Sequence, residues 1–412
     1  MYRYLFLIII TLTLTACTTM VRREYLPYPL TNEDVGEEAK VITIPLPVIA
    51  SSPNEGITAG ALTAFLVHNK RDEITTLLAP QVNQNPNFGT TFTLYGSLYP
   101  APDRSMEFNL SRSTRVNEDY EFRIRDNTFL DRKLELNAFA FSFTDGSARF
   151  FGFQPRTRRT RETNYADEET GFNLSAGYQI GSHFQLVFGE RYKKVDIGRG
   201  AITSVPYIRN VFPRSVPGVD GFSAHAQKLS LIYSTLDSPT LPTYGGYMRL
   251  GVESSSRDLG SSADYRHYDV EMKGFVPADK ERCYISAFRL AYNQTLGGGV
   301  PFLERSILGG ENTLRGYGRN RFIDSSYLLL NLEERIRVFR WEIFGVNADW
   351  EVAPFIDLGA VMKSLDQAKT SSFEFNPGLG VRAVVRPNIL GRVDVGFGKD
   401  GPSVFVGLGY PF

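Results

Sequence analysis

Apolar and polar residues alternate along most of this chain, from Ile57 to the C-terminal Phe412, in pieces of about ten residues. In one such piece, Phe172, Leu174 and Tyr178 are interleaved with small and polar residues. A period of two places successive side chains on opposite faces of a β-strand. About ten residues is also the length that a tilted strand needs to cross a bilayer. The pattern therefore predicts an all-β fold, a transmembrane antiparallel β-barrel.

The expected number of strands follows from the number of alternating pieces. We count 17 of them, at 57–67, 73–82, 88–98, 104–114, 119–129, 133–144, 171–180, 183–194, 226–236, 245–256, 264–277, 281–292, 326–338, 350–362, 375–386, 389–398 and 403–412. A bacterial single-chain barrel closes with an even number of strands. We therefore expect about 16 strands, with one early piece miscounted.

A soluble β-sandwich or propeller would show the same alternation around a packed core. The pieces here are longer than the roughly five or six residues usual in soluble sheets. Their apolar face is rich in Phe, Tyr and Leu throughout, and the last strand ends on Phe412. Aromatic residues make up 13% of the chain while its mean hydropathy is only −0.20, which suits strands with one apolar face. The zero net charge gives no sign of nucleic-acid binding.

The N-terminus carries the pattern of an export signal. One Arg precedes an apolar run from Leu5 to Ala16, which is too short to span a bilayer and fits the core of a signal peptide over residues 1–16. Leu14-Thr15-Ala16-Cys17 resembles a lipobox, which predicts lipidation of Cys17. The alternative is cleavage by the ordinary signal peptidase, with Cys17 incidental.

The remaining organisation is a short tail, a barrel and three long loops. Prolines and an acidic stretch indicate a periplasmic N-terminal tail over 17–47, and the barrel is expected over 48–412. Long loops are predicted at 149–168, 195–225 and 293–325. The first contains a basic cluster that could contact lipopolysaccharide phosphates or lie in solvent: Arg156, Arg158, Arg159 and Arg161.

The third loop contains an unusual motif, Gly309-Gly310-Glu311-Asn312-Thr313-Leu314-Arg315-Gly316-Tyr317. If this loop folds into the lumen, Arg315 loses water and needs carboxylate partners. Leucines at 328, 330 and 332 mark a lipid face, so Glu333 points inward, and the same alternation places Asp357 inward on the next strand. We expect the two carboxylates to hold Arg315 and lock the loop. The alternative is a set of charges solvated in the lumen.

These motifs resemble the surface-antigen barrels of the outer-membrane assembly-factor superfamily, to which BamA and TamA belong. The family's lumen-inserted Arg-Gly-aromatic tip is matched by Arg315, Gly316 and Tyr317. Its inward Glu in an Asn-x-Glu setting is matched by Asn331 and Glu333. The family's Phe-x-Asp-x-Gly strand is matched by Phe355, Asp357 and Gly359, and its Asp…Pro-x-x-Gly turn by residues 237–245. The stretches 52–56 and 149–152 also resemble the family. Its C-terminal assembly signal is matched by Gly407, Tyr410 and Phe412.

The chain also departs from that family. Fewer than 35 residues separate Cys17 from the expected barrel, too few for a periplasmic POTRA domain of the kind found in BamA and TamA. The expectation is a member without POTRA domains. Position 405, which is usually polar at the start of the terminal signal, is Phe405.

The resemblance implies a protein of the bacterial outer membrane that assists insertion, assembly or translocation of proteins or lipids. Its implied partners are outer-membrane lipids, lipopolysaccharide, an unfolded outer-membrane client and a separate periplasmic or lipoprotein partner. The physical basis would be weak pairing between the first and last strands, with Pro411 in the last strand unable to donate a hydrogen bond. Two alternatives remain, a passive pore or structural barrel and a lipid-modifying enzyme.

Little else in the sequence indicates chemistry. The four histidines lack metal-ligand spacing, and no Gly-x-Ser-x-Gly elbow occurs. We therefore expect no metal, no cofactor and no catalytic residues. With Cys17 in the export signal, Cys283 has no partner for an internal disulfide.

Overall fold

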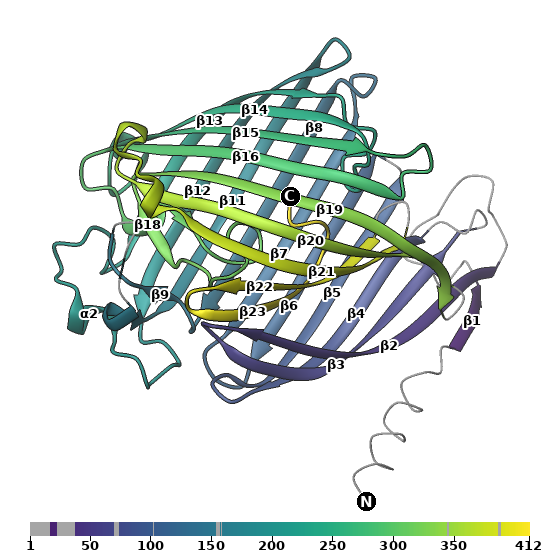
Figure 1. Cartoon of the computed structure of the whole chain (residues 1–412), viewed down its shortest axis with the longest axis horizontal. Coiled ribbons are helices and arrows are strands. Elements are labelled where there is room, and N and C mark those ends of the chain that lie inside the picture. Colours follow the sequence, from purple (N-terminus) through teal and green to yellow (C-terminus); the bar gives the residue numbers. More distant parts are fainter. Residues whose placement is uncertain are drawn as a thin grey trace, which may run out of the picture.

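The computed structural model describes residues 17–22, 38–69, 74–101, 103–153, 157, 159–343, 346–385 and 389–412. The predicted signal peptide and residues 23–37 of the predicted tail lie outside them. Nineteen strands form one antiparallel sheet, and β1 (Cys17–Arg22) pairs with β2 only, which leaves 18 strands in a closed barrel (Figure 1).

The barrel strands follow one another in chain order around the ring. They are β2 (Glu38–Ser52), β3 (Gly56–His68), β4 (Ile74–Asn85), β5 (Gly89–Ala101), β6 (Arg104–Ser113), β7 (Glu118–Phe129), β8 (Leu134–Asp145), β11 (Ala166–Ile180), β12 (Phe184–Gly198), β13 (Phe222–Ser234), β14 (Gly245–Ser255), β15 (Tyr265–Pro277), β16 (Tyr284–Gly297), β19 (Ser326–Ile343), β20 (Val346–Met362), β21 (Glu374–Val385), β22 (Ile389–Gly398) and β23 (Gly401–Leu408).

The predicted count of about 16 strands is wrong. Each of the 17 pieces found in the sequence overlaps one barrel strand, so none of them needed to be removed. The eighteenth strand is β2, which begins ten residues before the predicted barrel start at residue 48. Pro45 and Pro47 disguise it as a linker, because proline cannot donate to a ladder. β2 nevertheless pairs with β3 over 13 consecutive residues.

Alternation along the strands separates an apolar outer face from a polar inner face. Phe188, Leu229 and Val252 stand side by side on β12, β13 and β14, and all three are exposed. Their neighbours in sequence point inward, as Ser230 does on β13. A bulge between Arg337 and Phe339 reverses the alternation near the end of β19. No helix among the described residues is long and apolar enough to cross a membrane.

The two ends of the barrel differ in their connections. The three longest connections, between β8 and β11, β12 and β13, and β16 and β19, gather at the end shown on the left of Figure 1. They hold the short elements β9 (Arg149–Phe150), η2 (Arg159–Arg161), β10 (Thr163–Asn164), α2 (Ile208–Val211), η4 (Phe302–Glu304), β17 (Ser306–Leu308) and β18 (Phe322–Asp324). Buried residues from all three connections share one apolar cluster around Phe150, Phe212 and Phe302. This cap is joined to the barrel by Val195 and Phe222, at the ends of β12 and β13.

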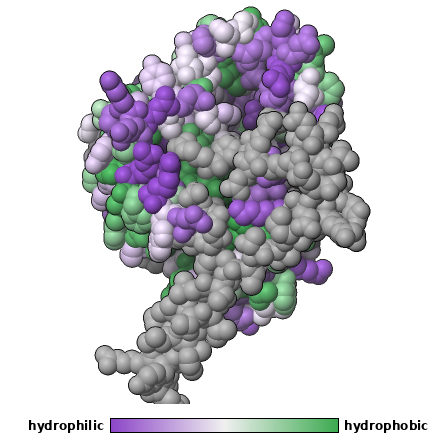
Figure 2. Space-filling view, turned by 90° about the vertical axis from the view of Figure 1, so that its right-hand side faces the viewer, coloured by the Kyte–Doolittle hydropathy of each residue, from purple (hydrophilic) through white to green (hydrophobic). Residues whose placement is uncertain are grey.

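Shorter turns lie at the opposite end, which also carries β1. The end with the long connections also holds three more short elements: η5 (Leu365–Gln367) and η6 (Thr370–Ser372) connect β20 to β21, and η3 (Arg257–Leu259) connects β14 to β15. Figure 2 views the end near β1 and shows hydrophilic residues gathered around it, with hydrophobic residues toward the sides.

The C-terminal strand is shorter than predicted. The sequence indicates a strand over 403–412, whereas β23 ends at Leu408, and Gly409 follows with a positive φ of 76°. Tyr410 and Phe412 therefore leave the alternation and turn toward the interior, where Phe412 packs beside Phe275 and Ile285. Pro411 lies outside the last strand, so its expected effect within that strand does not arise.

The outer apolar face generates a prediction. Leu229 is 47% exposed in the middle of β13, so in the membrane its side chain faces acyl chains. Replacing it with arginine, Leu229→Arg, is expected to destabilise the folded barrel by about 2–4 kcal/mol, because a charge at that depth is poorly solvated. Equilibrium unfolding of the protein in phospholipid vesicles by guanidinium measures the change.

Leu259→Arg is the matched control, since Leu259 is comparably exposed but lies in the η3 connection beyond the strands. It should change the free energy of unfolding by less than about 0.5 kcal/mol, as surface substitutions do. Equal destabilisation by the two variants would contradict a lipid-facing β13.

Candidate functional site

The connection between β16 and β19, which we call the 298–325 segment, carries the predicted motif. Gly309 and Gly310 both have positive φ, at 116° and 100°, and start a tight turn. In this turn the Tyr317 N–H donates to the Leu314 carbonyl at 3.1 Å, and the Gly310 N–H donates to the Tyr317 carbonyl at 3.0 Å. The turn projects Arg315 away from the backbone between Leu314 and Gly316, and the Arg315 side chain is fully buried.

Arg315 contacts both predicted carboxylates. Its Nε and Nη2 donate to the two oxygens of Asp357 at 2.9 and 2.8 Å, and its backbone N–H donates to the same carboxylate at 3.0 Å. Its Nη1 donates to Glu333 at 2.9 Å. The Phe355 ring lies under the guanidinium, 3.4 Å from its carbon to the ring centre. A guanidinium with two carboxylates and an aromatic face is a strongly held cation.

The partners come from the buried faces of adjacent strands. Glu333 on β19 and Asp357 on β20 are 4% and 0% exposed, while the leucines that alternate with Glu333 face outward. Asn331 on β19 also donates to Asp357, at 2.7 Å, and to the Thr313 carbonyl, at 2.8 Å. The tip is thus fixed to the barrel wall by its backbone as well as by its charge.

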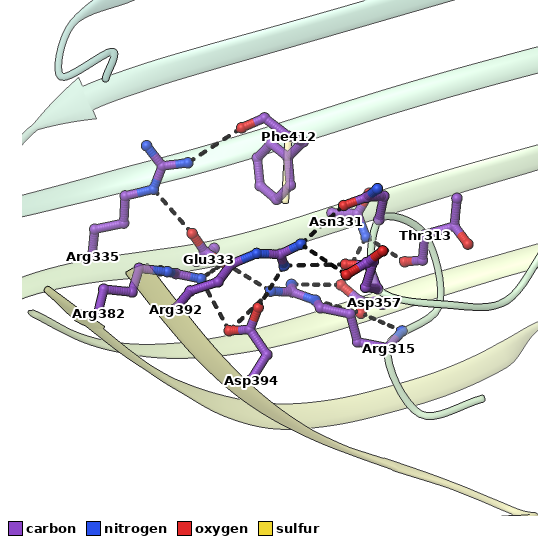
Figure 3. Close-up of polar contacts among 12 residues, drawn as sticks. Thr313, Arg315, Asn331, Glu333, Arg335, Asp357, Arg382, Arg392, Asp394 and Phe412 are labelled. Atoms are coloured by element: carbon purple, nitrogen blue, oxygen red, sulfur yellow. Dashed lines mark hydrogen bonds and ion pairs between the residues drawn. The ribbon is translucent and has the colours of Figure 1, made fainter. Parts of the chain in front are cut away.

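The cluster extends beyond the predicted residues (Figure 3). Glu333 also accepts from Arg335 at 2.9 Å and from Arg382 at 2.7 Å. Asp394 accepts from Arg382 at 3.2 Å and from Arg392 at 2.7 Å. Four guanidinium groups therefore meet three carboxylates, and Glu311 lies 3.6 Å from Arg392 as a fourth. These arginines were missed in the sequence, although each stands at an inward position of a predicted strand.

The pKa of Arg315 shows which effect dominates. Burial alone would lower it, but Asp357 and then Glu333 outweigh burial, so the pKa of Arg315 is raised above its usual value. The guanidinium therefore stays charged at neutral pH, as arginine side chains do. The site is an ionic contact between the loop tip and the barrel wall.

Glycines allow the tip to approach the wall closely. A Cβ at Gly396 would overlap the Arg315 backbone, and one at Gly398 would overlap the Gly316 backbone. A Cβ at Gly316 would in turn lie 2.7 Å from the Gly398 nitrogen. Backbone therefore packs on backbone here, which explains the Gly in the Arg-Gly-Tyr tip.

Tyr317, Phe355 and Gly359 support the same contact. The Tyr317 hydroxyl donates to Glu374 of β21 at 2.6 Å, and its ring packs edge-on against Phe322 at 4.9 Å between ring centres. Phe355 supplies the ring under Arg315, as described above. Gly359 lies beside Leu308 of β17, and a Cβ added to Gly359 would be 3.2 Å from the Leu308 Cδ1.

A second ion pair, absent from the sequence-based prediction, fixes the other half of the 298–325 segment. Glu304 is 7% exposed and accepts from Arg191 at 2.7 Å, pairs with Lys193 at 2.9 Å and accepts from the Tyr265 hydroxyl. Burial would raise the pKa of Glu304, but Lys193 and Arg191 outweigh burial and lower it. The sequence feature that could have indicated this site is the pair of cations Arg191 and Lys193, which stand at alternate positions of β12 and so share one face.

Other family-like stretches also meet at this segment. Arg149 donates from Nη2 to the Asn54 carbonyl at 3.0 Å, which joins the 149–152 stretch to the 52–56 turn. Asn54 in turn donates to the Arg319 carbonyl at 3.0 Å. Of the basic cluster, Arg156 and Arg158 lie outside the described residues, and Arg161 stacks on Phe212 at 5.1 Å within the cap.

The barrel closes at an incomplete junction, which we call the seam. β2 and β23 share one residue pair, Ser51 opposite Val404, whereas β22 and β23 share eight. In this antiparallel register, paired numbers sum to 455, so residues 44–50 of β2 would stand opposite 405–411. Within the described part of the chain, β2 has no strand partner on that side over 44–50.

The residues that follow β23 are held inside the barrel. Arg335 stacks on the Tyr410 ring at 3.4 Å and donates to the Phe412 carbonyl at 3.5 Å. The Tyr410 hydroxyl contacts Glu351 of β20 at 3.0 Å. Tyr410 and Phe412 also line a cavity of about 820 Å³. Since Arg335 binds Glu333 as well, one side chain links the loop tip to the C-terminal tail.

The other predicted positions are less informative. Gly407 lies in β23, and a Cβ added to it would be 3.5 Å from Nε of Arg392. Cys17 begins β1, where it stands opposite Thr43 of β2. Asp279, Glu281 and Cys283 lie close enough together in the β15–β16 turn to be considered as metal ligands. Their contacts are internal to the turn and its neighbour: Arg337 donates to the Cys283 sulfur at 2.9 Å, and the Asp279 carboxylate accepts from the backbone N–H groups of Cys283 and Tyr284. This group stabilises the turn.

Comparisons with known proteins bear on the family and the fold. Residues 104–398 match the family model described as the Omp85 superfamily domain. Among solved structures, BamA from Haemophilus ducreyi lacking POTRA domains 1–3 matches with a TM-score of 0.52 and 14% identity, over 89% of this chain and 74% of that one. CdiB from Acinetobacter baumannii matches with a TM-score of 0.46 and 10% identity, over 96% and 65% of the two chains. Among curated proteins, none matches in sequence.

The buried cluster generates a stability prediction. Arg315→Ala leaves the Asp357 carboxylate buried with Asn331 and one backbone N–H as donors. We expect a loss of about 3–5 kcal/mol in the free energy of unfolding, because a buried charge has lost its partner. Arg315→Lys should recover only part of the loss, since one ammonium cannot reproduce the forked contacts. Guanidinium unfolding of the detergent-solubilised barrel measures both.

Arg319→Ala serves as the control, four residues along the same segment. The Arg319 side chain is 60% exposed and pairs with Glu311 alone, so its removal should change the free energy by less than about 1 kcal/mol. The interpretation fails if Arg315→Ala is as mild as Arg319→Ala.

Proposed function

This chain belongs to the Omp85 superfamily, and on that premise we propose that it assists insertion of unfolded β-barrel proteins into the bacterial outer membrane at its seam. The family supports a general role in protein insertion or translocation. The proposal includes the remaining implied partners, namely outer-membrane lipid, lipopolysaccharide and a periplasmic or lipoprotein partner. It also includes lipidation of Cys17 and a role without enzymatic chemistry.

One observation carries the proposal, the unpaired edge of β2 at the seam. Backbone N–H and C=O groups that lack partners in hydrocarbon are costly, at several kcal/mol per group. The edge over 44–50 therefore favours any extended strand that can pair with it. Ile49 is 69% exposed beside this edge and offers apolar contact to an incoming strand. A client that pairs its strands one by one at this edge would avoid exposing unpaired backbone N–H and C=O groups to hydrocarbon.

In this proposal the 298–325 segment is the lumen-inserted loop of the family, and the Arg315 cluster locks it. A loop fixed at Arg315 and at Glu304 braces β19 to β22 against β12. The seam can then lack pairing while the rest of the barrel keeps its shape. The locking role of Arg315, Glu333 and Asp357 is structural, since none of them is free to transfer a proton or attack a substrate.

A disulfide across the seam tests the proposal. Ser51→Cys and Val404→Cys place cysteines directly opposite each other, in a Cys283→Ser background. We expect the reduced protein in liposomes to accelerate folding of a urea-unfolded eight-stranded barrel, and the oxidised protein to lose most of that acceleration, because the strands can no longer separate. Heat-modifiability on gels gives the folded fraction of the client with time.

The matched control is a disulfide across an ordinary junction. Val187→Cys and Ser230→Cys are directly opposite on β12 and β13, and their oxidation should leave the rate unchanged. Equal rates for the oxidised and reduced seam variant would exclude the seam as the site. An absence of acceleration by every form would reject insertion as the function.

The cavity of about 820 Å³ favours one second candidate, a passive pore. The two candidates differ in planar-bilayer conductance. A barrel closed by a locked loop should show low, erratic conductance that rises when Arg315→Ala releases the loop, with Arg319→Ala as the unchanged control. Steady conductance in the unaltered protein, unaffected by Arg315→Ala, would favour the pore.

A further inference from the structure

A second strand already lies on the open edge of β2. β1 pairs with it antiparallel over six residues, from Cys17 opposite Thr43 to Arg22 opposite Glu38. β3 occupies the other edge of β2 throughout, from Lys40 to Ser52. β1 therefore uses the edge that faces the seam, immediately before the unpaired stretch 44–50.

The seam-facing edge of β2 consists of three stretches that do not overlap. β1 pairs with residues 38–43, β23 pairs with Ser51, and no described strand pairs with residues 44–50. A client strand that pairs antiparallel with β2 and extends into its first half must use the backbone groups that β1 occupies. Two strands cannot share one edge, because each N–H and C=O on that side has one partner direction.

β1 is well placed for reversible occupancy. Its six residue pairs are fewer than the 13 between β2 and β3, so its release breaks a short ladder. Fifteen residues connect Arg22 to Glu38, which stand directly opposite each other in the register. Because these residues join β1 covalently to β2, the return of a released β1 to the edge is intramolecular. β1 therefore returns readily unless another strand has taken its place.

We propose that β1 is a built-in occupant of the seam-facing edge of β2, which a client strand must displace before it can pair along residues 38–43. The occupant is the chain's own segment Cys17–Arg22. Its effect is to restrain the activity, and the restraint rests on the proposed insertion function. The strand-on-edge contact itself does not depend on that function.

Crosslinking tests the contact in the full chain, reconstituted in liposomes with Cys283→Ser. The pairs Thr19→Cys with Val41→Cys and Met20→Cys with Lys40→Cys are directly opposite, so at least one should oxidise nearly completely. Met20→Cys with Val48→Cys lies eight residues out of register on the same edge and should not. Protection from a polyethylene-glycol maleimide, reversed by reductant, reports each disulfide. Equal protection of the displaced pair, or none of either, overturns the proposal.

The client-folding assay tests displacement with the same proteins. Oxidation of an in-register pair should slow client folding about tenfold relative to the reduced form, and deletion of residues 18–22, which keeps Cys17, should raise the rate by up to about tenfold if the edge is free one-tenth of the time. Deletion of residues 25–30, which keeps β1, is the control and should not raise it.

The outcomes separate the two proposals. In-register crosslinks with an unchanged client rate overturn the restraint and leave seam-mediated insertion standing. If no form accelerates client folding, including the 18–22 deletion, the insertion function fails and the restraint fails with it. In that case the crosslinks still decide whether β1 lies on the edge.

Discussion

Backbone pairing is the constraint on which this structure depends. In hydrocarbon every N–H and C=O needs a partner, so a spanning sheet must close on itself. Seventeen of the 18 junctions in this barrel do so with eight or more residue pairs, a few of them interrupted by a bulge, and the junction between β2 and β23 does so with a single pair. The incomplete junction is a local feature, because every other strand is paired on both sides. At the seam, residues 44–50 of β2 are the stretch left without a strand partner.

The buried charge cluster and the incomplete junction are parts of one arrangement. Arg335 binds Glu333, which also binds Arg315 of the loop, and it stacks on Tyr410 of the tail. The tail therefore stays inside for the same reason that the loop stays against the wall. Moving either one disturbs a shared set of buried charges, and an unpaired buried charge is unfavourable. Side chains on β19 therefore contact both the loop tip and the tail beside the seam.

The sequence predicted the parts of the fold that follow from local alternation. All 17 alternating pieces are strands, because outward residues such as Leu229 face lipid regardless of distant contacts. It failed at β2, whose prolines conceal a strand, and at Gly409, where an aromatic alternation gives way to an inward turn. The motif pointed to Arg315, Glu333 and Asp357. The contacts of Arg335, Arg382 and Glu304 depend on which side chains come together across the lumen. Alternation along single strands gives the direction of each side chain but not its partners.

The inward course of the last four residues has a practical consequence for handling the protein. Phe412 ends beside Phe275 with its carbonyl at Arg335, inside the wall of the barrel. Any fusion attached there must either thread through the cavity or pull the terminal tetrapeptide out into the bilayer. An affinity label on this end would therefore alter the very closure it was meant to leave intact, and an exposed hairpin such as 181–183 is the safer position for one.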